Sequence, residues 1–201
     1  MKIPKSQRPM RSPRAMKPMK APKIKLIHNL PELTNGQMPA GCIRVRFMSQ
    51  WGRPMAITAS AAGIHRLEFL PDGETLDDES PESADQNIRN AIDHLAGQEV
   101  DGNIIVSPVC TRFRLSVYQA LMQIPSGSTV RYKDVASFIG KPNSTRAVAG
   151  AVAKNDIAIL IPCHRVVPAT GGYGNYRWGA DLKAEIIESE RREKAKTLSE
   201  D

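Results

Sequence analysis

Pro162 is the residue that most constrains the fold, because it separates an apolar run from a cysteine-histidine pair. The five residues before it, 157–161, are all apolar and predict a strand. A proline fixes its own φ angle and pushes the preceding residue toward extended backbone, so this strand has to end at Ile161. Cys163 and His164 then fall in a turn, where their side chains can approach each other, whereas on a strand they would point to opposite faces.

A thiol beside an imidazole is a candidate nucleophile with its base. A free cysteine has a pKa of about 8.5 and is mostly protonated near neutral pH, so Cys163 needs a base, and His164 is the candidate. Glu190 is the candidate that orients His164. On a helix predicted over 182–192, its carboxylate stands on an apolar stripe, where a charge needs a partner. The alternatives are a buried cysteine beside a surface histidine, and a surface carboxylate at a frayed helix end.

Cysteine usage indicates the compartment. Cys42, Cys110 and Cys163 lie far apart, form no metal-ligand spacing and leave one cysteine unpaired in any disulfide scheme. We therefore expect a reducing compartment, the cytoplasm or a eukaryotic nucleus, in which a nucleophilic thiol stays reduced. No apolar run approaches the roughly 18 residues of a membrane span, so no membrane association is expected.

The N-terminal tail carries the whole positive excess of the formal net charge of +7. Residues 1–25 hold nine of the 28 Lys and Arg residues and none of the 21 acidic residues, which leaves 19 basic against 21 acidic side chains elsewhere. The cations recur at every third position between prolines, as on one ridge of a polyproline II helix. This ridge could follow DNA phosphates; a disordered extension and a targeting peptide are the alternatives. We predict a disordered, basic, proline-rich tail over 1–35.

Residues 36–107 predict a small α/β domain. Strand-like runs at 42–48, 54–59 and 63–70 are followed by a helix at 84–95 and a further strand at 104–106. His65 lies within a strand and is expected to be structural, and Cys42 is expected to pack. The domain has no obvious reactive group.

Residues 108–201 predict a mainly α domain. A helical pattern over 113–124 ends at Pro125-Ser126-Gly127, a second helix over 133–139 ends at Gly140, and a third covers 144–154, with Asn143 or Ser144 as its cap. Two helices joined by a tight turn have the organisation of a helix-turn-helix.

The third of these helices is the candidate for contact with DNA because its two faces differ. Ala147, Val148, Ala151 and Val152 can pack inward, while Arg146, Gly150 and Ala153 face outward. One cation on a smooth surface allows close approach to a duplex but offers few groups for reading base identity. An ordinary core helix with one exposed arginine is the alternative.

Several motifs extend this pattern in one order from Phe113 to Glu190. They are Ile124-Pro125-Ser126-Gly127, Arg131-Tyr132, Val135-Ala136, Ile139-Gly140-Lys141-Pro142, Arg146-Ala147-Val148, Asn155, 161–167, 174–179, Lys183 and Glu190. Together they resemble the catalytic domain of the O6-alkylguanine-DNA alkyltransferase family, which repairs methylated guanine. The run Tyr176-Arg177-Trp178-Gly179 resembles the bacterial adaptive-response subtype.

The resemblance implies a fold and an activity. The N-terminal domain would be ribonuclease H-like, and the C-terminal domain would carry a winged helix-turn-helix-like motif. The protein would be a monomer that binds double-stranded DNA containing O6-alkylguanine and flips the damaged base, with no cofactor and no metal. It would transfer a methyl group irreversibly from O6-methylguanine, and from O4-methylthymine, to Cys163, so that each molecule reacts once.

The resemblance also implies the site residues. The catalytic residues would be Cys163, His164, Glu190, Tyr132 and Asn155, with Asn155 as a left-handed helix cap that holds the turn before the cysteine. The DNA contacts would come from Arg146, Tyr132, Ala147, Gly150, Ala153 and Arg165. The substrate pocket would be lined by Tyr176, Arg177, Trp178 and Val166, with the side chains of Arg177 and Trp178 narrowing it.

Three alternatives to this activity are open. A noncatalytic alkyltransferase-like DNA binder has tryptophan in place of the reactive cysteine, so Cys163 argues against it. A cysteine hydrolase would leave the helix-turn-helix and Arg146 unexplained. A zinc site at Cys163 and His164 would need a second pair of ligands nearby in the sequence.

Overall fold

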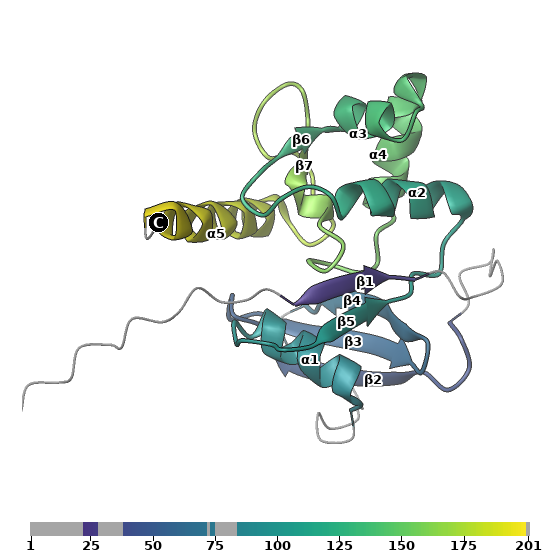
Figure 1. Ribbon diagram of the computed structural model, residues 1–201, viewed down its shortest axis with the longest axis vertical. Coiled ribbons are helices and arrows are strands. Elements are labelled where there is room, and N and C mark those ends of the chain that lie inside the picture. The colour runs from purple at the N-terminus through teal and green to yellow at the C-terminus, as the bar shows by residue number, and fades with distance from the viewer. Residues whose placement is uncertain (1–21, 28–37, 72, 75–83, 200–201) are drawn as a thin grey trace, which may run out of the picture.

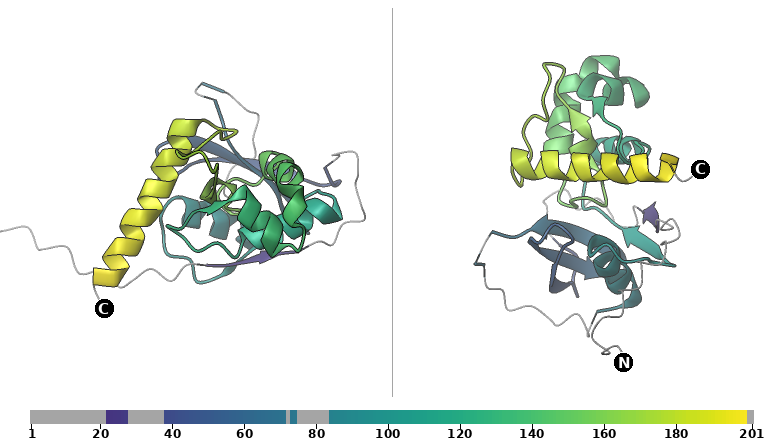
Figure 2. Two further views of the ribbon diagram at one scale, coloured as in Figure 1. Left: turned by 90° about the horizontal axis from the view of Figure 1, so that it is seen from above. Right: turned by 90° about the vertical axis from the view of Figure 1, so that its left-hand side faces the viewer.

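A sheet layer and a helical layer make up the protein, and both are visible in Figure 1. The computed structural model describes residues 22–27, 38–71, 73–74 and 84–199. The sheet contains β1 (Lys23–Leu26), β2 (Ile43–Met48), β3 (Pro54–Ser60), β4 (Gly63–Phe69) and β5 (Asn103–Val106), in the order β1-β5-β4-β3-β2. The helical layer contains α2 (Arg112–Leu121), α3 (Tyr132–Phe138), α4 (Thr145–Ala153) and α5 (Ala180–Ser199). The two views of Figure 2 show α5 lying across the helical layer as one long rod.

Alternation of side chains explains which face of the sheet is buried. Val45, Ile57 and Leu67 stand side by side on β2, β3 and β4, and none of them is exposed. Their sequence neighbours Arg44 and Arg66 point to the other face, because successive side chains of a strand alternate. Helix α1 (Gln86–Leu95) buries its apolar stripe of Ile88, Ala91 and Leu95 against the sheet.

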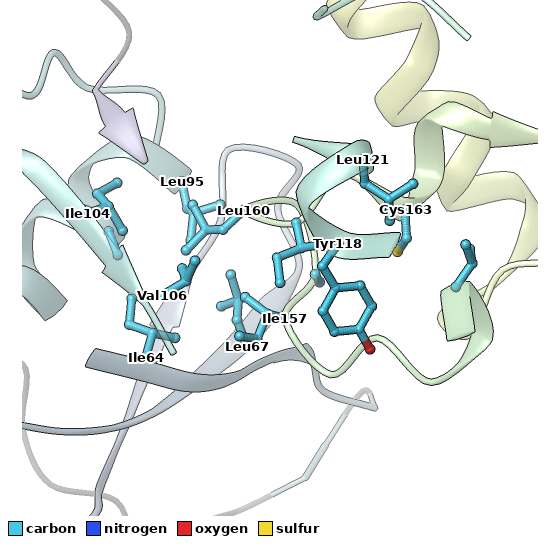
Figure 3. Packing of buried hydrophobic residues seen from close by; sticks show 14 of the residues in the cluster. Ile64, Leu67, Leu95, Ile104, Val106, Tyr118, Leu121, Ile157, Leu160 and Cys163 are labelled. Atoms are coloured by element: carbon cyan, nitrogen blue, oxygen red, sulfur yellow. The ribbon is translucent and has the colours of Figure 1, made fainter. Parts of the chain in front are cut away.

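One hydrophobic core connects the two layers, as Figure 3 shows. Leu67 and Val106 contribute from the sheet, and Tyr118 and Leu121 contribute from α2. Between them lie Ile157 and Leu160, which come from the segment that precedes the cysteine. The apolar residues of this segment are therefore buried because they fill the space between the layers.

The predicted strand over 157–161 is wrong. Ile157 makes one isolated parallel bridge with Leu67 of β4, and the residues after it form a turn. Ile159 has a φ of 63°, in the left-handed region that a β-branched residue rarely adopts, and this interrupts any extended chain. An apolar run alone did not distinguish a strand from a buried irregular segment.

This segment nevertheless attaches to the sheet. The parallel pairing of β5 with β4 consists of Ile64 and Val106, after which β5 ends. Beyond that point the backbone N–H of Leu67 donates to the carbonyl of Asp156 at 2.8 Å, and the N–H of Ala158 donates to the carbonyl of Leu67 at 2.8 Å. The segment thus takes the place of β5 beside β4 and fixes the entry to the cysteine turn.

Most of the other predicted elements are confirmed. The strands at 42–48, 54–59, 63–70 and 104–106 are β2 to β5, and the five predicted helices are α1 to α5, with ends shifted by a few residues. Helix α5 is longer than predicted, and α4 follows a short 3-10 turn, η3 (Pro142–Ser144). Ser144 takes the N-cap position of α4 without a capping hydrogen bond from its side chain. No helix in the described ranges is long and apolar enough to cross a membrane.

His65 has the structural role that the sequence predicts. Its ring is buried, with Nε2 2.7 Å from the hydroxyl of Ser60 and Nδ1 2.6 Å from the carbonyl of Ser107. It therefore ties the β3–β4 turn to the chain that leaves β5.

The predicted disordered tail over 1–35 is wrong at 23–26, where β1 pairs in parallel with β5. Ile24 and Leu26 pack against the core, and Lys23 and Lys25 alternate with them on the exposed side. The charge repeat of the tail continues into these lysines and hides the alternation of the strand. Residues 1–21 and 28–37 lie outside the described residues, and the division into domains at 107 and 108 remains a prediction.

Two truncations at the N-terminus distinguish the contribution of β1 to stability from that of residues 1–21. Removal of 1–27 is expected to lower the free energy of unfolding by about 2 kcal/mol, because two partly buried apolar side chains and the pairing of β5 are lost. Removal of 1–21 is expected to leave it unchanged. Chemical denaturation of both truncated proteins measures this difference, and equal stability of the two would contradict it.

Candidate active site

Cys163 lies in the turn that the sequence predicts. Residues Cys163–Arg165 form a single 3-10 turn, η4, directly after Pro162, and lead into β7 (Val166–Val167), which pairs in parallel with β6 (Val130–Arg131). The cysteine is 5% exposed. Its thiol therefore sits inside the protein, between the segment that contacts β4 and the short β6–β7 pair.

Asn155 holds this thiol with its side chain. The amide Nδ2 lies 3.0 Å from the Sγ of Cys163, 3.0 Å from the carbonyl of Ile161 and 3.1 Å from the carbonyl of Ile157. Its Oδ1 accepts a hydrogen bond from the backbone N–H of Ile157 at 3.1 Å. One buried amide thus closes the loop that runs from the end of α4 to the cysteine.

The backbone of Asn155 is not the left-handed cap that the sequence predicts. Among the described non-glycine residues, Ile159 is the one with a positive φ. The prediction placed the strained position four residues too early, because Asn is a common left-handed residue and Ile is a rare one. The loop is held by the Asn155 amide instead.

The buried environment keeps the thiol protonated at rest. Burial raises the pKa of Cys163, while the hydrogen bond from Asn155 and the positive charge of Lys183 act to lower it. Because the thiolate is disfavoured until it is needed, a base has to remove the proton during the reaction.

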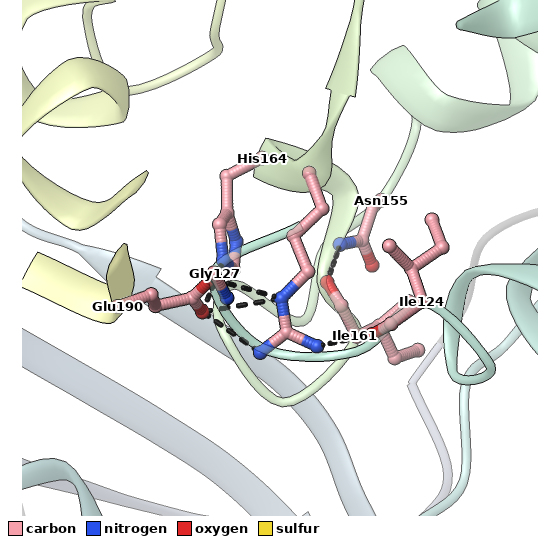
Figure 4. A network of polar contacts seen from close by, with 7 residues as sticks. Ile124, Gly127, Asn155, Ile161, His164 and Glu190 are labelled. Carbon is pink, nitrogen blue, oxygen red and sulfur yellow. Dashed lines mark hydrogen bonds and ion pairs between the residues drawn. The ribbon is translucent and has the colours of Figure 1, made fainter. Parts of the chain in front are cut away.

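His164 is a buried imidazole with one nitrogen engaged and one available. Its Nε2 lies 2.9 Å from the Oε1 of Glu190, which Figure 4 shows, and its Nδ1 is buried without a hydrogen-bond partner among the described residues. Burial lowers the pKa of His164, although the hydrogen bond and charge of Glu190 act to raise it. With Nε2–H donating to the carboxylate, Nδ1 is left as the acceptor.

Glu190 is ionised by its partners. Burial acts to raise its pKa, but the hydrogen bonds and charges of His164 and Arg165 outweigh this and lower it to about 2. The backbone N–H of Gly127 adds a further hydrogen bond to Oε2, at 3.0 Å. Gly127 has a φ of +71°, and a Cβ there would lie 3.0 Å from the carbonyl oxygen of Glu190, so this close approach requires glycine.

Arg165 is placed differently from the expectation of a DNA contact. Its guanidinium is directed to the carboxylate of Glu190 and to the carbonyl of Ile124, and its side chain is 17% exposed. No local pattern predicts this placement, because Glu190 and Ile124 are 25 and 41 residues away along the chain.

A cavity of about 360 Å³ opens beside the thiol. Its walls are formed by Tyr132, Val152, Ala153, Asn155, Cys163, Asn175, Tyr176, Arg177, Trp178 and Lys183. It therefore brings together the predicted residues Tyr132, Tyr176, Arg177 and Trp178 around the cysteine. Val166 does not line it: this side chain is fully buried elsewhere.

Lys183 is a site residue for which the sequence analysis predicted no role. It is 1% exposed, and its Nζ donates to the carbonyl of Val166 at 2.7 Å. Burial lowers its pKa, and the neighbouring Cys163 acts to raise it. Its spacing from Ile187 and Glu190 places it on the inward stripe of α5, which was the signal that could have identified it.

The outer wall of the cavity is built on the sheet. The Trp178 ring contacts that of Tyr176 edge to face at 5.0 Å between centroids, and contacts Phe69 of β4 at 6.0 Å. The Arg177 guanidinium lies over the Trp178 ring at 5.6 Å and forms an ion pair with Asp156. These contacts fix the two large side chains in the wall of the cavity, and whether they narrow it for a substrate remains a prediction.

The outward face of α4 carries small side chains and one arginine. Arg146, Gly150 and Ala153 are exposed as predicted, and Ala147 is also exposed rather than packed inward. At the end of the helix, the hydroxyl of Tyr118 donates to the carbonyl of Lys154 at 3.0 Å. This bond joins the end of α4 to α2.

Comparison with known proteins gives one consistent family. The family described as "6-O-methylguanine DNA methyltransferase, DNA binding domain" matches residues 112–192. The "Methylated-DNA--protein-cysteine methyltransferase" of Methanosarcina barkeri is 32% identical over 142 residues, which are 68% of this chain and 90% of that protein. The "Bifunctional transcriptional activator/DNA repair enzyme Ada" of Escherichia coli is 43% identical over 105 residues, 52% of this chain.

A solved structure is similar over both layers. "Crystal structure of Mycobacterium tuberculosis OGT in complex with DNA" aligns with a TM-score of 0.63 at 28% identity and covers 75% of this chain and 93% of that one. The match to Ada, in contrast, covers 30% of the length of that protein.

Replacement of Asn155 by Leu tests whether its side-chain amide stabilises the loop before Cys163. The carbonyls of Ile157 and Ile161 would lose their buried donor, so the free energy of unfolding is expected to fall by about 2 kcal/mol. Asn175→Leu, at an exposed position of the same cavity, is the control and is expected to change it little. Urea unfolding measures both, and an equal effect of the two substitutions would argue against the role.

Proposed function

Because the chain belongs to the methylated-DNA–protein-cysteine methyltransferase family, we propose that it repairs DNA by moving a methyl group from O6-methylguanine irreversibly to Cys163. O4-methylthymine offers the same kind of methyl ether and is proposed as a second substrate. The observation that carries this proposal is a buried thiol in the wall of a cavity, next to a neutral histidine that is oriented by an ionised carboxylate.

The reaction is one displacement. The proton of Cys163 passes through one water to the free Nδ1 of His164, and the positive charge of Lys183 stabilises the thiolate. The sulfur then attacks the methyl carbon, the bond from carbon to guanine O6 breaks, and its electron pair stays on the guanine. Tyr132, in the wall of the same cavity, donates a proton toward the departing base. The thioether product is not hydrolysed under mild conditions, so each molecule reacts once.

Binding to double-stranded DNA is proposed to use α3, η3 and α4 as a winged helix-turn-helix-like unit. The smooth exposed face of α4 allows close approach to the minor groove, and Arg146 enters the base stack when the damaged nucleotide turns out. Flipping costs a few kcal/mol, and least for a weakly paired base, which favours alkylated guanine. Tyr132 would lie against the adjoining phosphate. Arg165 does not support the proposal, because its guanidinium is engaged within the protein.

The N-terminal sheet is proposed to be a ribonuclease H-like domain that supports the site. Three antiparallel strands, a helix and a parallel strand follow in that order, which is consistent with this arrangement. The protein is proposed to act as a monomer without a cofactor.

Mass spectrometry of the protein after reaction tests the acceptor. Incubation with a duplex that contains O6-methylguanine is expected to add one methyl group to the peptide that contains Cys163. Cys163→Ser should abolish the transfer, while Cys110→Ser should not, since Cys110 does not line the cavity. Turnover of the substrate without modification of the protein would support a hydrolase, and binding without reaction would support a passive binder.

The pocket wall predicts a preference for small alkyl groups. Trp178 and Arg177 line the cavity with large side chains that we propose narrow it, so we expect O6-methylguanine to react well and O6-benzylguanine poorly. Trp178→Gly should open the wall and raise the rate with O6-benzylguanine by tenfold or more, a gain of roughly 1.4 kcal/mol in transition-state binding, with a smaller effect on the methyl substrate. Equal rates for the two substrates in the unsubstituted protein would contradict this preference.

A further inference from the structure

The side chain of Arg165 is fully engaged within the active-site network. Its Nε lies 3.1 Å from each oxygen of Glu190, its Nη2 lies 2.7 Å from Oε1, and its Nη1 donates to the carbonyl of Ile124 at 2.6 Å. All three guanidinium nitrogens thus have partners inside the protein. A planar fork that meets both oxygens of a carboxylate is the geometry for which arginine is suited and lysine is not.

The carboxylate of Glu190 is shared between Arg165 and His164. Oε1 accepts from the Nη2 of Arg165 at 2.7 Å and from the Nε2 of His164 at 2.9 Å, while Oε2 accepts from the backbone of Gly127. A buried carboxylate that faced the imidazole alone would favour the imidazolium. An imidazolium has no lone pair and cannot take a proton from the thiol.

We propose that Arg165 is a positioning residue that keeps His164 neutral, and therefore able to accept a proton, by forming an ion pair with the carboxylate of Glu190. The carboxylate can then orient the imidazole without converting it to a cation. The inference about the charge state of His164 stands on this geometry. Its consequence for the reaction rate rests on the proposed function.

The charged groups around His164 agree with this assignment. Glu190 and Lys183 face it from α5, and Arg165 and Cys163 flank it in η4. Burial lowers the pKa of His164 most, Arg165 and Lys183 lower it further, and Glu190 alone acts to raise it. Loss of Arg165 would therefore shift this balance toward the protonated form.

Two more titratable groups lie near Arg165 and Glu190. Glu193 of α5 and His94 of α1 line a cavity of about 320 Å³ that Arg165 and Glu190 also line, between the helical layer and the sheet. Burial lowers the pKa of His94, which favours its neutral form. Neither of these residues makes a hydrogen bond to the Glu190 carboxylate in the described part of the chain.

A purely structural role of Arg165 is the competing explanation. Its bond to Ile124 and its ion pair with Glu190 join α5 to the turn after α2, so its loss could simply loosen this contact. A structural loss would lower activity equally at all pH values. Loss of control over the charge of His164 would instead move the pH at which activity appears.

NMR titration of the His164 ring separates these explanations without any use of DNA. The chain has four histidines, and comparison with His164→Gln assigns the signals. Arg165→Met is expected to raise the pKa of His164 by about one unit, because a neighbouring positive charge is lost. Arg165→Lys keeps the charge but loses the fork, so a smaller rise is expected. An unchanged pKa in Arg165→Met would overturn the proposal.

Arg191→Met is the matched control. Arg191 lies on α5 directly after Glu190 and pairs with Glu188 on the exposed side of that helix, so the substitution makes the same change in charge and removes an exposed ion pair. It is expected to leave the pKa of His164 unchanged, and an equal rise in this variant would overturn the proposal. Thermal unfolding checks the fold of each variant. If Arg165→Met does not fold, the smaller rise in Arg165→Lys decides the question, and its absence would overturn the proposal.

The rate of methyl transfer gives the second measurement. In single-turnover reactions, the acid limb of the pH profile of Arg165→Met is expected to move up by about one pH unit, so that the rate below the limb falls about tenfold and recovers at high pH. A uniform loss with an unmoved limb would overturn the proposal. If the unsubstituted protein transfers no methyl group at all, the proposed function fails, and the NMR titration still decides the role of Arg165.

Discussion

The geometry of the site depends on the buried amide of Asn155. Its Nδ2 contacts the thiol of Cys163 and the carbonyls of Ile157 and Ile161, so it holds the nucleophile and both ends of the preceding turn. The turn includes Ile159 in a left-handed conformation, which costs of order 1–3 kcal/mol and persists only when its surroundings determine it. A single side chain thus couples the end of α4 to the position of the sulfur.

Around this fixed sulfur, burial and charge act in opposite directions. Burial disfavours the ionised forms of Cys163, His164 and Lys183, while Glu190 stays ionised because His164 and Arg165 donate to it. A protonated thiol, a neutral imidazole and an ionised carboxylate can therefore coexist within one network. In the proposed reaction, the transfer of the Cys163 proton toward His164 produces the thiolate that attacks the methyl group.

The N-terminal sheet contributes to the site although it supplies none of the proposed catalytic residues. Leu67 of β4 exchanges backbone hydrogen bonds with Asp156 and Ala158, and Phe69 of the same strand contacts the ring of Trp178. The sheet thereby positions both the turn that carries Cys163 and a large side chain in the cavity wall. These packed contacts resist deformation because protein interiors are close-packed.

The candidate nucleophile and most of the local structure could be predicted from the sequence. The pair Cys163 and His164 after a proline, the inward position of Glu190 and the periodicity of each helix are local patterns, and local patterns survive folding. The partners of Arg165, the hydrogen bond of Lys183 to Val166, the hydrogen bonds of the Asn155 amide and the addition of β1 to the sheet became evident in the folded structure alone. Each of these features either joins residues that are distant in the chain or buries a polar side chain. Which groups meet in this way depends on how the two layers pack, and the spacing of residues along the sequence does not specify it.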